Sequence, residues 1–223
     1  MAQQPISAVR TGTSTGATVE VNRVLRNTYL LLGMTLAFSA ATAGISMSLN
    51  LPHPGLLLTL GGWFVLLMAI NKTADSAWGL FWVFAFTGFL GYTMGPILNI
   101  YLQMPNGADV VTMALASTAA AFIGLSSVAL ITRKDFSFMS SFLTVGILVV
   151  FAVVMLSWFM DLSAFYGAIG AAVVLLMSGL ILWQTSAIIH GGETNYILAT
   201  TTLYMSIYNM FSWLLLLFGM GDD

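Results

Sequence analysis

Residues 196–218 read YILATTTLYMSIYNMFSWLLLLF and contain no charged side chain. An α-helix needs about 20 predominantly apolar residues to cross the hydrocarbon core of a bilayer, so this segment is long enough to span a membrane. Within it, Thr202, Ser206, Asn209 and Trp213 recur at the spacing of one helical face. Lipid chains offer no hydrogen bonds, so this face predicts a helix that packs against protein near the centre of a bundle.

Six more apolar segments precede this one along the chain. We place them at 29–49, 55–70, 77–102, 110–132, 139–160 and 164–188. Only helices and closed barrels satisfy backbone polar groups inside lipid. We therefore predict an all-α integral membrane protein, with a seven-helix transmembrane domain over residues 29–219. Residues 1–28 are expected to form a flexible cytoplasmic tail, and residues 220–223 a short tail on the far side of the membrane.

The basic residues indicate the orientation of this bundle. All six precede the first segment or lie in alternate loops: Arg10, Arg23, Arg26, Lys72, Arg133 and Lys134. Cytoplasmic loops of membrane proteins carry an excess of Lys and Arg. The pattern therefore predicts a cytoplasmic N-terminus, and the odd number of helices places the C-terminus on the opposite side.

The composition excludes several classes of protein. Charged residues make up 6% of the chain, against about 25% in a soluble domain. The net charge of −2 gives no reason to expect a nucleic-acid partner, and the chain has no cysteine. The two histidines, His53 and His190, are predicted on opposite sides of the membrane. We therefore predict no enzyme, no catalytic residue, no cofactor and no metal site.

Every charged residue falls in a loop or at the end of a segment. Asp109, Asp135 and Asp161 are expected to cap the starts of helices, where a carboxylate suits the helix dipole. The remaining polar groups inside the segments are uncharged, above all on the face that includes Ser206 and Asn209. We expect that face to form hydrogen bonds between helices; the alternative is a polar-lined cavity.

Small residues predict close helix packing at two places, because they let backbones approach each other. The third segment carries Gly88, Gly91 and Gly95, and Pro96 is expected to kink it near its outer end. The sixth segment carries Gly167, Gly170 and Ala171, which are expected to make a similar contact.

Three runs of sequence are more specific than composition. They are GFLGYTMGPIL at 88–98, TRKDFS at 132–137 and IIHGGETNY at 188–196. In this order and spacing they resemble the transmembrane Bax inhibitor motif family, and within it the proteobacterial YccA-like branch. The resemblance implies six helices wrapped around a central seventh. It also implies the bacterial inner membrane as location, with the C-terminus in the periplasm.

The resemblance implies two kinds of function. Many members resemble pH-sensitive calcium leak channels gated by paired aspartates on the sixth and seventh helices. This chain has Gln184 and Ser206 at those positions, with Asn209 close by, and neither side chain of the pair ionises at physiological pH. The YccA-like branch is associated with FtsH, a membrane-anchored ATP-dependent protease.

We therefore expect an inner-membrane protein that binds and modulates FtsH, as substrate or inhibitor, in membrane-protein quality control. The alternative is a calcium or proton leak channel with an altered, non-carboxylate gate, and a purely structural bundle is a third possibility. The expected partners are the lipid bilayer, FtsH and other membrane proteins.

The loop before the seventh segment carries the family motif His190, Gly191, Gly192 and Glu193. Glycine adopts positive φ readily, so the pair predicts a tight turn. Glu193 is expected to cap the start of the seventh helix. The alternative is that His190 and Glu193 contact a ligand or a partner.

Overall fold

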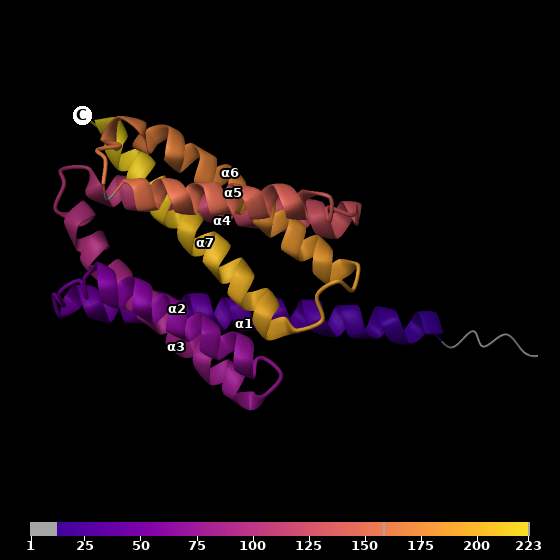
Figure 1. Cartoon of the computed structure of the whole chain (residues 1–223). Helices are drawn as coiled ribbons and strands as arrows, with labels where there is room; N and C mark the ends of the chain where they lie inside the picture. The colour runs from indigo at the N-terminus through magenta and orange to yellow at the C-terminus, as the bar shows by residue number, and fades with distance from the viewer. Residues whose placement is uncertain (1–12, 158, 223) are drawn as a thin grey trace, which may run out of the picture.

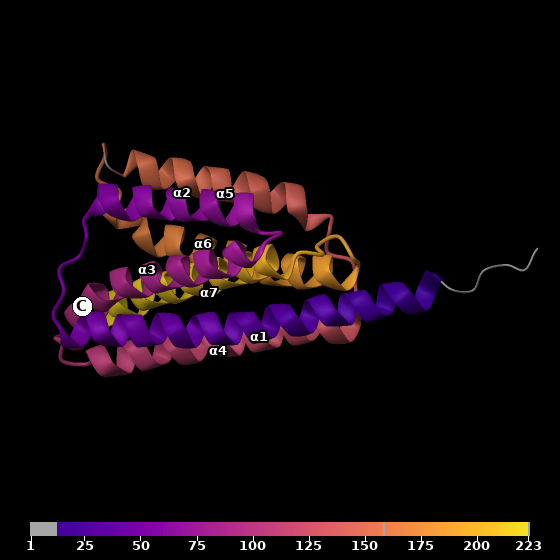
Figure 2. The ribbon, with the colours of Figure 1, turned by 90° about the horizontal axis from the view of Figure 1, so that it is seen from below.

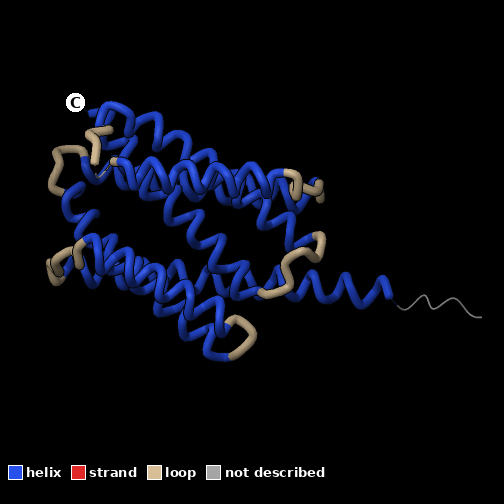
Figure 3. Tube along the Cα trace, in the orientation of Figure 1, coloured by secondary structure: helices blue, strands red, loops and turns tan. Residues whose placement is uncertain are grey.

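The structure is a computed structural model that describes residues 13–157 and 159–222. Seven of its helices are long and apolar enough to cross a membrane. They follow one another up and down through a bundle (Figures 1 and 3). Their bounds are α1 Thr13–Ser48, α2 Leu56–Thr73, α3 Ala77–Leu102, α4 Gly107–Thr132, α5 Met139–Leu156, α6 Tyr166–Ile189 and α7 Tyr196–Gly219. Two short 3₁₀ helices complete the fold. The first, η1 Ser163–Phe165, precedes α6, and the second, η2 Met220–Asp222, follows α7.

Helix α7 crosses the middle of the bundle, as its polar face predicts. It packs against α1, α2, α3, α4 and α6, and α5 packs against α6 on the outside. Figure 2 shows α7 enclosed by its neighbours when the bundle is viewed from below. The largest apolar cluster includes Leu203, Tyr204 and Met210 of α7. The predicted all-helical class and seven spans are therefore confirmed.

Helix α1 begins earlier than the hydropathy indicates. Residues 13–28 were expected to be a tail, but they belong to α1, and the helix projects beyond the bundle (Figure 2). One reason lies in packing: Val24 is buried against Ile188 of α6 and Ala199 of α7. Hydropathy drops across this polar stretch, but it does not decide whether the stretch is helical. Residues 1–12 lie outside the described residues.

The glycines of α3 make the predicted close contact with α1. A side chain at Gly91 would collide with Thr42 and with the backbone of Ser39, and Gly88 and Gly95 are similarly crowded by α1. The expectation for the sixth helix is correct only at Gly170, which packs against Leu217 and Trp213. It is wrong for Gly167, which has open space beside it, and for Ala171, which is exposed, because that face of α6 points away from its neighbours.

Helix α3 continues through Pro96, as the predicted segment 77–102 requires, and the expected kink there stays a prediction. Proline has no amide hydrogen, so the carbonyl of Tyr92 loses its usual partner four residues later. Ser46 of α1 donates its hydroxyl to that carbonyl at 3.0 Å. Gly95 allows α1 to come this close, because a side chain there would strike Ser46. A neighbouring helix thus satisfies the backbone group that proline frees, as membrane helices require.

The three aspartates do not cap transmembrane helices with their side chains. Asp109 lies in the first turn of α4, where its carboxylate suits the helix dipole as expected, although Asn106 occupies the cap position. Asp135 and Asp161 lie further upstream, and each accepts a hydrogen bond from an amide two residues later, Ser137 at 2.8 Å and Ser163 at 3.0 Å. They shape the turns that precede α5 and η1.

Candidate functional site

The family-motif loop ends α6 with a defined turn. Gly191 has φ of 74°, a left-handed conformation that glycine adopts without strain. The amide of Gly191 donates to Ile188 O at 3.2 Å, and the amide of Gly192 donates to Ala187 O at 2.8 Å. This pair of bonds is the Schellman motif, which satisfies carbonyls left free at a helix end. It turns the chain toward α7.

His190 and Ser186 fasten this loop to the connection between α4 and α5. His190 Nε2 lies 3.2 Å from Arg133 O, and its Nδ1 lies 2.9 Å from Ser186 O. The Ser186 hydroxyl donates to Lys134 O at 3.1 Å and accepts from the Phe136 amide at 3.0 Å. A carbonyl oxygen only accepts, so His190 makes both contacts as hydrogen bonds only when its ring carries both protons.

Asn195 fastens the same loop to the turn between α2 and α3. Its Nδ2 donates to Ala74 O at 3.1 Å and to Asp75 Oδ1 at 2.9 Å. Its Oδ1 caps α7 by accepting from the amides of Ile197 at 2.9 Å and Leu198 at 3.3 Å.

Glu193 was expected to cap α7, and the structure gives that role to Asn195. Glu193 Oε1 instead accepts from the Asn195 amide at 2.8 Å, so it orients the residue that caps. Asparagine is among the strongest helix caps because its short side chain reaches the free amides of the first turn.

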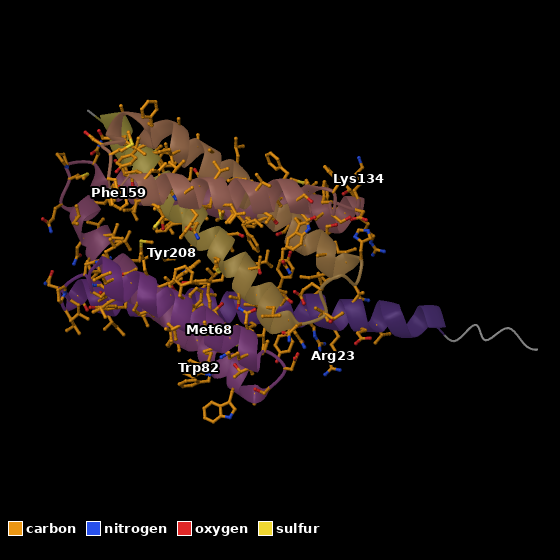
Figure 4. The ribbon with its side chains drawn as sticks, in the orientation of Figure 1. Arg23, Met68, Trp82, Lys134, Phe159 and Tyr208 are labelled. Carbon is orange, nitrogen blue, oxygen red and sulfur yellow. The ribbon has the colours of Figure 1, made fainter. Side chains whose placement is uncertain are left out.

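We call Ser186, His190, Glu193 and Asn195 the loop clasp. Through it the α6–α7 loop holds the α2–α3 turn on one side and the α4–α5 connection on the other. All three loops lie at the end of the bundle from which α1 projects, where Figure 4 places Arg23 and Lys134, opposite Phe159. The described basic residues therefore gather around one organised surface.

Asp135 adds an electrostatic element next to the clasp. Hydrogen bonds from the side chain and the amide of Ser137 lower the pKa of the Asp135 carboxyl below its ordinary value, and the nearby His190 lowers this pKa further. The carboxylate is fully exposed to solvent. Its charged form therefore favours the observed turn before α5.

The predicted central polar residues lie apart from the clasp, within the bundle. Gln184 and Ser206 are 2% and 1% exposed, yet no hydrogen bond joins them among the described residues. The Ser206 hydroxyl donates to Thr202 O at 2.9 Å, and Asn209 Nδ2 donates to Met205 O at 2.8 Å. These bonds return to the backbone of α7 itself, so the expected hydrogen bonds between helices are not the role of this face.

The polar face of α7 instead lies along a cavity whose other lining residues are mostly apolar, so the polar-lined cavity of the alternative interpretation is found only on the α7 side. The cavity has a volume of about 470 Å³ and is bounded by α2, α3, α5, α6 and α7. Thr202, Ser206, Asn209 and Trp213 all lie along it, and Gln184 does not. Its lining carries no charged residue.

A second cavity of about 570 Å³ lies on the other side of α7, between α1, α3 and α4. Tyr208 lines both cavities, and its hydroxyl lies 3.2 Å from that of Thr93. The Tyr204 hydroxyl bonds to the hydroxyl of Ser39 and donates to Thr87 O at 3.3 Å. These two tyrosines anchor α7 to α1 and α3, and Tyr208 stands between the two cavities.

Neither cavity offers the groups that metal or acid–base chemistry needs. In residues 13–157 and 159–222, no three His, Asp or Glu side chains come together in a way that could hold a metal ion.

Comparison of the sequence with known proteins shows its family. The family model described as "Inhibitor of apoptosis-promoting Bax1" matches residues 21–223. The chain belongs to the Bax inhibitor family. The matched residues include the three runs at 88–98, 132–137 and 188–196 on which the sequence resemblance rests. The family description does not name an enzyme.

Among the relatives, the "Modulator of FtsH protease YccA" of Escherichia coli K12 is 52% identical over 204 residues. The match covers 92% of this chain and 93% of the relative. The "Inner membrane protein YccA" of Escherichia coli O6:H1 matches equally well. An uncharacterized protein of Pseudomonas aeruginosa is 53% identical over 206 residues, again 92% of this chain and 93% of the relative. The chain is therefore a multi-pass protein similar to YccA proteins of the inner membrane.

The sequence analysis assigned no role to Ser186 and Asn195 of the clasp, although the position of each residue in the sequence suggests one. Ser186 precedes His190 by four residues and thus lies on the same helical face. Asn195 stands directly before the apolar run of α7, which is the position that helix caps occupy. The partner loops of these residues could be found only in the structure.

Proposed function

We propose that this protein binds the FtsH protease and modulates it in the inner membrane. The observation that carries the proposal is the 52% identity, over 92% of the chain, to a relative named as a modulator of that protease. The similarity extends through the membrane helices and the loops alike. We also propose the orientation that the basic residues predict, with the loop clasp in the cytoplasm.

The clasp end of the bundle is the docking surface that we assign to FtsH. The clasp holds three loops in fixed positions, and α1 extends past them. Prearranged loops bind with a smaller loss of conformational entropy than mobile ones. A protease working at the cytoplasmic surface would meet α1 and these loops first.

The bundle itself suggests how modulation works. Its spans pack through glycine contacts between α1 and α3, and α7 is held by hydrogen bonds to both of those helices. A chain that is extracted slowly occupies the protease and spares other substrates. Inhibitor and substrate roles are then two stages of the same interaction.

Photo-crosslinking in cells tests the docking surface. A photoreactive residue at Thr194, exposed in the clasp loop, should give an adduct with FtsH. The same residue at Met104, exposed in the α3–α4 loop at the other end, is the matched control and should not. Adducts of equal yield at both sites, or at neither, would count against this surface.

Variants of the clasp provide a second test of the docking surface. His190→Ala should reduce the Thr194 adduct because the α4–α5 connection is released. His53→Ala is the control, since His53 lies at the other end and bonds only to the nearby Gly55 amide at 3.1 Å among the described residues.

An ion leak is the second candidate, and the polar face of α7 along the 470 Å³ cavity is the observation that favours it. Gln184 and Ser206 do not ionise, so flux through reconstituted protein should lack a carboxylate transition between about pH 5 and 8. Gln184→Asp combined with Ser206→Asp should introduce one if the two side chains can approach each other. A pronounced transition in the unmodified protein that persists in His190→Ala would contradict this.

A further inference from the structure

The 570 Å³ cavity beside α7 opens sideways, between α1 and α4. These two helices both line the cavity and both pack against α3 and α7, but they do not pack against each other. On α1 the rim of the cavity carries Ala40 and Gly44, and on α4 it carries Ala119 and Ile123. All four residues are exposed. Small residues at three of the four positions therefore leave an opening from the cavity to the surrounding membrane.

The cavity extends along one half of the membrane thickness. Its lining on α1 runs from Leu36 to Met47, one residue before that helix ends, and its lining on α4 begins at Val111, near the start of that helix. Eleven residues of helix rise by roughly 16 Å, and half of the hydrocarbon core is about 15 Å. The cavity thus runs from the end of the bundle opposite the clasp to the middle of the bilayer, which is the depth of one leaflet.

The hydroxyl groups in the wall of the cavity already have partners. Ser39 and Tyr204 bond to each other, and the Tyr208 hydroxyl lies 3.2 Å from that of Thr93. Thr118 donates to a carbonyl of its own helix at 2.7 Å. The other residues of the lining are apolar. Apolar cavities in proteins stay dry, so the wall favours an apolar occupant over water or an ion.

We propose that this cavity binds one acyl chain of a phospholipid from the adjoining leaflet. Lipid chains are as apolar as the lining, so the gain comes from filling a space whose walls would otherwise lack contact partners. The volume of the cavity lies within the range of roughly 300–1,000 Å³ that is typical of small-molecule sites. A helix with its side chains is about 10 Å wide, and a helix of this length would need more than twice the volume of the cavity. A single flexible chain matches its length, its width and its chemistry.

The bound chain would join two helices that have no packing contact of their own. It would pack against α1 on one side and α4 on the other, with α7 behind it. The inference does not rest on the interaction with FtsH, so either can fail alone. Only the choice of the periplasmic leaflet rests on the proposed orientation.

Photolabelling of the full chain in lipid vesicles tests the site. The vesicles consist of phosphatidylethanolamine with a small fraction of the same lipid that carries a diazirine in the middle of one acyl chain. Adducts are located by mass spectrometry. We expect the lining residues of α1 and α4 to be labelled several-fold more than Leu148, an exposed residue of α5 outside the cavity.

Filling the cavity should remove this labelling. A side chain at Gly44 meets open space, so Gly44→Phe can occupy the cavity without disturbing its neighbours, and the adducts on α4 should fall several-fold. Gly33→Phe is the matched control, because Gly33 lies on the same helix with open space beside it but outside the cavity. Ala119→Phe fills the cavity from the opposite wall, and it applies the same criterion if Gly44→Phe fails to fold.

Three outcomes would overturn the proposal. Equal labelling of the cavity lining and Leu148 would mean that lipid only surrounds the protein. Labelling of α4 that persists in both Gly44→Phe and Ala119→Phe would place the chain elsewhere. The chain has no cysteine, so oxidation of Ala119→Cys tests a third occupant: a disulfide-linked dimer that Leu148→Cys does not form would show that a second copy of this protein covers the opening.

Discussion

At the residue scale, single side chains carry the connections between loops. Asn195 caps α7 and also reaches Ala74 and Asp75 in the α2–α3 turn. Arg133 ends α4 with φ of 50°, and its carbonyl is the one that His190 contacts. A left-handed conformation at a residue with a side chain persists only where neighbouring contacts hold it. The clasp provides such a contact.

Asn195→Ala should destabilise the protein, because it removes the α7 cap and the link to the α2–α3 turn together. Loss of a cap alone costs about 1 kcal/mol, so a midpoint lowered by at least 2–4 °C is expected in thermal unfolding. Asn106→Ala is the matched control: Asn106 occupies the cap position of α4 without a side-chain cap bond. Equal effects of the two changes would show that the Asn195 contacts do not stabilise the fold.

Asp135 should make the turn before α5 sensitive to acid. Its pKa is lowered in the folded protein, so its stabilising contribution is complete above the ordinary carboxyl pKa and is lost as pH falls through the folded value. The Ser137 amide, which donates to Asp135, should therefore lose hydrogen-exchange protection only below about pH 4. In Asp135→Asn this acid-dependent step should disappear, and its persistence would assign the step to another group.

At the element scale, hydropathy predicts that the seven spans exist, but it does not predict every helix boundary. The predicted 77–102 segment coincides with α3, because its apolar run ends at turns. The start of α1 depends on Val24 packing between α6 and α7, a contact between distant segments. The cavity along α7 was likewise one of two alternatives, since spacing defines a polar face but not what the face meets.

Ser46 and Pro96 test how α1 supports α3. Ser46→Ala should cost about 1–2 kcal/mol, because the Tyr92 carbonyl is left unpaired inside the bundle. Pro96→Ala restores an amide that can pair with Tyr92 within α3. The double variant should therefore recover most of the loss in thermal unfolding. No recovery would show that the Ser46 hydroxyl does not substitute for the missing amide.

At the scale of the whole molecule, Figure 4 places Arg23 and Lys134 at the end of the bundle from which α1 projects. Lys72 lies in the last turn of α2, Arg133 ends α4, and Arg23 and Arg26 lie in the first half of α1. The positive-inside rule places this end in the cytoplasm. A reporter enzyme active only in the periplasm should work when fused after Asp223. The same reporter inserted after Asp135 should be inactive. Activity at Asp135 with none at the C-terminus would reverse the orientation.

Degradation by FtsH tests the central claim most directly. Purified FtsH is reconstituted in vesicles with a labelled membrane substrate and ATP, and the substrate's half-life is measured with and without this protein. We predict a longer half-life in its presence, and a weaker effect with His190→Ala than with His53→Ala. An unrelated seven-helix membrane protein at equal density is the control. A substrate half-life that does not change at saturating amounts of this protein would contradict the proposed function.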